Sequence, residues 1–244
     1  MLFIFETKPP LILQVLENIV YASEFSPCIL FLILLKSIKT KDYKVLFLYT
    51  CVLAASMATL LFLISRNLPL TWAQRIFPLL ECPLLCYFYY LSLKKTTAKM
   101  LILSSAAVIL CAGFIYDMTT GKKDPSFLPM SVEGFFFTLV ILYFFYEKIK
   151  YINDVPIYTI ATFWVSIAFL LNFSGTFFLY LYSTYMKDDP DFLDQYHILY
   201  GFFTISKNVL FCIGIFVNRN AILPKKTTFN EPNLDFESVI KNKP

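Results

Sequence analysis

Lys207 is the residue whose position in the sequence most clearly indicates a functional site. It lies within the apolar run 198–217, which contains no other charged residue. A lysine near the centre of a bilayer costs roughly 2.5–3.5 kcal/mol on insertion scales, so it requires an acidic partner, a water-filled cavity or a covalent adduct. We therefore expect Lys207 to face the interior of the protein and to mark its functional site.

Two carboxylates lie at the same expected depth as this lysine. Counted to the first basic residue after each apolar run, Glu24 and Lys207 are both 12 residues away and Glu81 is 13 residues away. At the helical rise of about 1.5 Å per residue, all three groups lie about 18–20 Å from one face of the membrane. We predict an ion pair between Lys207 and Glu81, or alternatively Glu24, with Asn172 and Asn208 close enough to complete the hydrogen bonding.

Three further ionisable residues are expected nearer the outer boundary. Glu17 and Glu133 are interpreted as interfacial residues or as the rim of an outward-opening vestibule. His197 is the single histidine and lies at the outer edge of its apolar run, where an incidental position is expected.

The elements that must position these groups are long apolar helices. The chain has 244 residues, is 58% hydrophobic and has a mean hydropathy of +0.64, which is typical of a multi-pass membrane protein. About 20 apolar residues are needed to cross a bilayer as a helix, and period-two alternation is missing, so an all-α fold is predicted. Seven runs qualify as spans, at residues 11–35, 45–64, 76–93, 100–116, 131–146, 157–186 and 198–217.

The distribution of basic residues predicts the orientation of these spans. Connections on one side hold 14 lysines and arginines, and those on the other side hold 6. Because basic residues concentrate on the cytoplasmic side, the amino terminus is predicted outside and the carboxyl terminus inside. We divide the chain into a seven-helix domain, residues 1–217, and a polar, disordered cytoplasmic tail, residues 218–244. The first residues lack a signal-peptide pattern, so the first span is expected to be retained.

Several functional classes have no support in the sequence. No nucleic-acid-binding pattern is present, and Cys82 and Cys86 have no histidine or carboxylate at metal-ligand spacing beside them. The usual nucleophile, phosphate-loop and metalloprotease motifs are missing, so no catalytic residue is predicted and no cofactor is assigned. Within span 157–186, Ala168, Asn172 and Gly175–Thr176 share one face, which favours close helix packing or the lining of a polar cavity.

Three segments, 75–90, 172–179 and 197–211, together resemble an uncharacterised seven-helix inner-membrane family of Bacteroidetes-type bacteria. The segments read RIFPLLECPLLCYFYY, NFSGTFFL and HILYGFFTISKNVLF. Members of this family often occur near sensor histidine kinases. The resemblance implies a bacterial inner-membrane location, a signalling partner such as a histidine kinase, and importance of Glu81, Asn172, Lys207 and Asn208.

Two other layouts are similar in outline. The retinal-binding rhodopsins also have seven spans, a lysine in span 7 and a carboxylate in span 3, but Pro78 and Phe203 here replace acidic residues of their pattern. Sugar-transporter folds combine two parallel three-helix repeats with a linker helix.

From the sequence as a whole we expect a receptor-like or sensory membrane protein that binds a small or amphipathic ligand, or a proton. The alternatives are a small-molecule transporter, a retinal-binding protein or a lipid-modifying protein.

Overall fold

The computed structural model describes residues 11–34, 40–120, 127–150, 156–186 and 189–220, and all regular structure within them is helical. The predicted all-α class is therefore confirmed. The predicted tail falls almost wholly outside the described residues. Seven long helices and one short 3-10 turn make up the fold: α1 (Leu11–Ile33), α2 (Lys41–Ser65), α3 (Thr71–Ser92), α4 (Thr96–Thr120), α5 (Phe127–Lys150), η2 (Ile157–Thr159), α6 (Ala161–Met186) and α7 (Pro190–Asn220).

Six of these seven helices are long and apolar enough to cross a membrane. The exception is α3, which has 22 residues and includes both Arg75 and Glu81. Their charges lower the hydropathy of α3 below that of its neighbours, although its length is sufficient. The described part of the chain thus has the character of a multi-pass membrane protein.

The helices extend beyond the predicted apolar runs into polar sequence. The predicted spans 157–186 and 198–217 leave the acidic segment 187–195 between them, but α7 already begins at Pro190. Proline is favoured in the first turn of a helix because the amide it lacks has no intrahelical partner there. The sixth span was predicted from residue 157, whereas residues 157–159 form η2 and α6 begins at Ala161.

The connection from α2 to α3 is fixed by backbone hydrogen bonds. Asn67 has a φ of 50°, a left-handed conformation that asparagine tolerates better than most residues. The Leu68 amide donates to the Leu63 carbonyl at 2.9 Å, and the Asn67 amide donates to the Ile64 carbonyl at 3.0 Å. This pair of bonds is the Schellman arrangement, which satisfies carbonyls at the end of α2 and turns the chain sharply.

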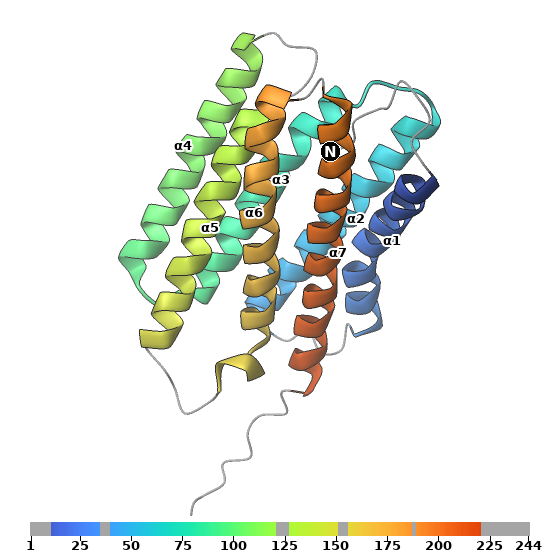
Figure 1. The fold of residues 1–244 in the computed structure, drawn as a ribbon. Coiled ribbons are helices and arrows are strands. Elements are labelled where there is room, and N and C mark those ends of the chain that lie inside the picture. Colours follow the sequence, from blue (N-terminus) through green and yellow to red (C-terminus); the bar gives the residue numbers. More distant parts are fainter. Residues whose placement is uncertain (1–10, 35–39, 121–126, 151–155, 187–188, 221–244) are drawn as a thin grey trace, which may run out of the picture.

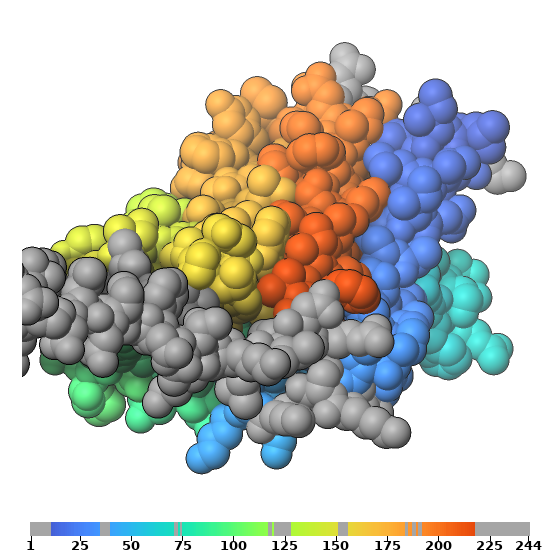
Figure 2. Space-filling model, turned by 90° about the horizontal axis from the view of Figure 1, so that it is seen from below, coloured from blue at the N-terminus to red at the C-terminus, as the bar shows by residue number. Residues whose placement is uncertain are grey.

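Six helices form a closed ring through their contacts with one another. Helix α4 lies outside this ring, at the edge of the bundle (Figure 1). Each ring helix packs against the next in the order α1, α2, α3, α5, α6, α7 and back to α1. Figure 2, viewed along the bundle, shows α6 and α7 lying between α5 and α1. Helix α4 packs against α3 and α5 from the outside. The third predicted span, which α3 forms, is thus a member of the ring wall.

A close contact between α6 and α7 is made possible by a glycine. A Cβ atom on Gly175 would lie 2.5 Å from the ring of Phe203, so the aromatic side chain occupies the space above the glycine. Small residues permit this kind of close packing between membrane helices. Both interpretations of the 168–176 face hold, since Gly175 serves packing while Asn172 and Thr176 line a cavity.

We predict that Gly175→Ala destabilises the protein by about 1–3 kcal/mol, because the added methyl group overpacks the contact with Phe203. The matched control is Gly134→Ala, whose Cβ would lie no closer than 3.5 Å to its neighbours and should be tolerated. Thermal unfolding of the purified protein in detergent measures both effects. Adding Phe203→Leu should recover part of the loss, and equal stability of the two alanine variants would contradict the packing argument.

Candidate functional site

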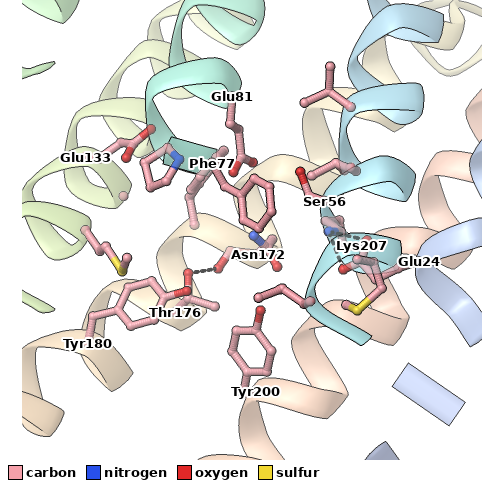
Figure 3. A pocket seen from close by; sticks show the side chains of 18 residues that line it. Glu24, Ser56, Phe77, Glu81, Glu133, Asn172, Thr176, Tyr180, Tyr200 and Lys207 are labelled. Carbon is pink, nitrogen blue, oxygen red and sulfur yellow. Dashed lines mark hydrogen bonds and ion pairs between the residues drawn. The ribbon is translucent and has the colours of Figure 1, made fainter. Parts of the chain in front are cut away.

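Lys207 forms a buried ion pair with Glu24 across the contact between α1 and α7 (Figure 3). Its Nζ lies 3.0 Å from Oε1 and 3.4 Å from Oε2 of Glu24. The two side chains are only 7% and 9% exposed, so both charges are removed from lipid and from bulk water. A charge this deep is tolerated when a hydrogen-bonded counter-charge accompanies it, and this pair also joins the first and last helices of the ring.

Glu81, which we expected first as the partner of Lys207, has a different neighbour. The hydroxyl of Tyr49 donates to Oε1 of Glu81 at 2.7 Å. The depth predicted for Glu81 agrees with its place beside the cavity. The pairing with Lys207 does not form because α3 lies between α2 and α5 in the ring and is not a neighbour of α7. The alternative partner, Glu24, is on the helix adjacent to α7.

These groups face one cavity of about 180 Å³ inside the ring (Figure 3). All six ring helices contribute to its lining, and α4 contributes none of it. The charged lining residues are Glu24, Glu81, Glu133 and Lys207. The uncharged polar ones are Ser56, Asn172, Thr176, Tyr180 and Tyr200, and the remainder of the wall is apolar or glycine.

Four of the five site residues predicted from the sequence line this cavity: Glu24, Glu81, Asn172 and Lys207. Asn208 does not. Its side chain is buried, and its Nδ2 donates to Oγ of Ser23 at 3.0 Å, so it ties α7 to α1 beside the ion pair. A ligand-binding role for these residues remains a prediction.

Glu133 belongs to the cavity, although we expected it at the outer boundary. The depth count used for the other groups also applies to α5, since Glu133 is 15 residues from Lys148, the first basic residue after this apolar run. The predicted span begins at residue 131, which puts Glu133 close to its outer end, whereas α5 begins four residues earlier, at Phe127. The cavity tyrosines Tyr180 and Tyr200 gave no such signal, because sequence alone does not say which face of a helix turns inward.

Glu17 and His197 pair with each other instead of standing apart at the rim. Nδ1 of His197 lies 3.6 Å from Oε1 of Glu17, and the histidine side chain is only 6% exposed. The histidine is thus buried and paired with a carboxylate, while its expected lack of a functional role stays a prediction. This pair lies against a second, smaller cavity rather than the main one.

An aromatic cluster lies beside the main cavity, toward the end of the bundle at which α2 and α6 begin and α7 ends. The rings of Tyr49 and Phe169 are 5.3 Å apart, those of Phe169 and Phe211 are 5.2 Å apart, and those of Tyr49 and Phe211 are 6.1 Å apart. All three side chains are buried, and each lies further toward this end of its helix than the cavity-lining residues. We call Tyr49, Phe169 and Phe211 the aromatic plug. Tyr49 connects this plug to the cavity, because its ring packs in the plug while its hydroxyl donates a hydrogen bond to Glu81.

The chemistry of this site follows from its charge balance. Three carboxylates and one ammonium group line it, so a fully ionised site would carry a net charge of −2 in an apolar surrounding. Such an excess is costly unless protons or a bound cation neutralise it. Within the described ranges, no group of three metal-ligating side chains is found.

We predict that Lys207→Met alone destabilises the protein by about 3–5 kcal/mol, because it leaves the Glu24 carboxylate buried without its partner. Adding Glu24→Gln should restore most of this loss, whereas adding Glu81→Gln should restore little. Thermal unfolding of the single and double variants gives the comparison. Equal rescue by both glutamine substitutions would mean that the two acids share the lysine.

Comparison of the sequence with protein-family profiles and with curated proteins, and of the fold with solved structures, finds no match.

Proposed function

We propose that this chain is a receptor-like integral membrane protein that binds a small cationic ligand, or a proton, in the cavity lined by the six ring helices. The observation that carries the proposal is the excess of carboxylates over ammonium groups in a cavity deep within apolar helices. Ionisable groups at such positions are seldom kept unless they serve a function. In this assignment α3 is the seventh membrane span, and its Glu81 belongs to the binding site.

The size of the cavity favours a small ligand. A volume of about 180 Å³ is below the roughly 300–1,000 Å³ of sites for drug-sized molecules. The lining supplies two kinds of contact suited to an amine. Carboxylates and the amide of Asn172 can accept hydrogen bonds from an ammonium group, and the rings of Phe77, Tyr180 and Tyr200 can pack against its carbon atoms or its charge.

Tyr49 provides a route from ligand binding to a conformational change. Its hydroxyl is hydrogen-bonded to Glu81, and its ring packs against Phe169 of α6 and Phe211 of α7. A cation that draws Glu81 toward itself competes with Tyr49 for the carboxylate. The rings of the plug would then repack, and the inner halves of α2, α6 and α7 would shift.

The signal is then passed to another protein on the cytoplasmic side. The excess of basic residues at the connections after α1, α3 and α5 supports an orientation with the amino terminus outside and these connections inside. The proposal places the output in a separate signalling partner, such as a histidine kinase, in the bacterial inner membrane. The resemblance of segments 75–90, 172–179 and 197–211 supports this partner and location.

A small-molecule transporter is the second candidate, and the order of the helices supports it. Around the ring, α1, α2 and α3 are followed by α5, α6 and α7, with α4 outside as the connecting helix. Two parallel three-helix units joined by a linker give this order, and transporters built in this way bind substrate between the two units. Substrate-dependent flux into vesicles containing the pure protein distinguishes a transporter from a receptor.

We predict that small organic cations stabilise the protein and that small anions do not. Methylammonium, guanidinium and choline are compared with acetate at equal ionic strength by thermal unfolding in detergent. Glu133→Gln should weaken the effect about tenfold or more, because a lost charge-assisted hydrogen bond costs about 1.5–3 kcal/mol. The half-buried carboxylate of Asp42, at the start of α2 and outside the cavity lining, supplies the matched control in Asp42→Asn, which should leave the effect unchanged.

A melting temperature that responds to pH but to none of the cations would assign the proton as the ligand. No response to either, or equal stabilisation by acetate, would refute the proposed site.

A further inference from the structure

A second cavity of about 40 Å³ lies next to the main one, nearer the beginning of α1 and α7. Its wall is formed by residues of α1, α2 and α7: Leu16, Glu17, Val20, Tyr21, Met57, Leu60, His197, Tyr200 and Gly201. Three of these, Met57, Leu60 and Tyr200, also line the main cavity. The two cavities are therefore separated by only one layer of side chains.

We call this second cavity the outer cavity. Its polar groups suit a small cation, as do those of the main cavity. The carboxylate of Glu17 is 3.6 Å from Nδ1 of His197, and the hydroxyl-bearing side chain of Tyr21 belongs to the same wall. A cation that arrives here finds one carboxylate and an aromatic ring before it reaches the three carboxylates of the main cavity. Both cavities thus favour positive charge.

The contact between α1 and α7 cannot provide the passage between them. A Cβ atom on Gly201 would lie 3.2 Å from Val20 and 3.3 Å from Leu16, so the backbone of α7 already lies against side chains of α1. The Glu24–Lys207 ion pair holds the same two helices together further in. The flexible side chains of Met57 and Leu60 on α2 can change rotamer without separating any helices.

We propose that the outer cavity is an antechamber through which a small cation reaches the main cavity, and that Met57, Leu60 and Tyr200 form the gate between them. This inference rests on the cation site proposed above and adds its access route. The gate opens on the α2 side, while α1 and α7 stay joined. Ligands accordingly arrive from the amino-terminal side of the bundle.

The test measures how fast a small reagent reaches a cysteine placed in the main cavity. Ser56 lines the main cavity but not the outer one, so S56C reports arrival beyond the gate. Aminoethyl methanethiosulfonate is the cationic probe, and sulfonatoethyl methanethiosulfonate is its anionic counterpart. Peptide mapping by mass spectrometry separates modification at position 56 from that of the six native cysteines.

We expect Leu60→Ala to accelerate modification by the cationic probe about tenfold and Leu60→Trp to slow it by a similar factor. The matched control is Leu53→Ala, because Leu53 lines the main cavity without reaching the outer one. Glu17→Gln should slow the cationic probe and leave the anionic probe unchanged. Unchanged melting temperatures of the parent and gate variants ensure that the rates compare folded proteins.

The two proposals fail in different ways in this experiment. If the cationic probe is faster than the anionic one but the Leu60 substitutions change nothing, the cation site stands and the gate is refuted. If Leu53→Ala accelerates modification as much as Leu60→Ala, the access route does not pass the proposed gate. If both probes react equally fast in all variants, the cation preference itself is wrong.

Discussion

The structure depends on one constraint, which is that ionised groups at the centre of apolar helices must turn toward each other. Lys207 and Glu24 satisfy it directly, with 3.0 Å between the ammonium nitrogen and a carboxylate oxygen. The pair brings the first and last helices together and so closes the ring. Because the ring is closed, its interior can hold further polar groups that would otherwise face lipid.

Within the ring, a polar layer and an aromatic layer follow each other along the bundle axis. The polar layer is the cavity of Glu24, Glu81, Glu133 and Lys207, and the aromatic plug of Tyr49, Phe169 and Phe211 lies next to it along the bundle. Tyr49 is shared by the two layers, so a change at Glu81 reaches packed rings directly. The ion pair, the Asn208–Ser23 hydrogen bond and the close approach at Gly201 all join α1 to α7 on one side of the cavity.

Sequence-based depth counting located most of the site but could not assign its pairs. Glu24, Glu81 and Lys207 were placed in one layer, and the cavity contains all three. Depth depends on helical rise alone, which is nearly constant. Pairing depends on which helices are neighbours around the ring, and this is why Lys207 meets Glu24 of α1 while Glu81 meets Tyr49 of α2.

The sequence by itself determined the helical class and the approximate positions of seven helices, because apolar runs of this length have few other stable arrangements. It also determined that Lys207 needed a buried partner. Tertiary structure decided the ring order, the exclusion of α4, the presence of Glu133 in the cavity, and the close approach of Phe203 to Gly175. These features depend on how whole helices rotate and pack against each other. Contacts between side chains that are distant in sequence determine that packing.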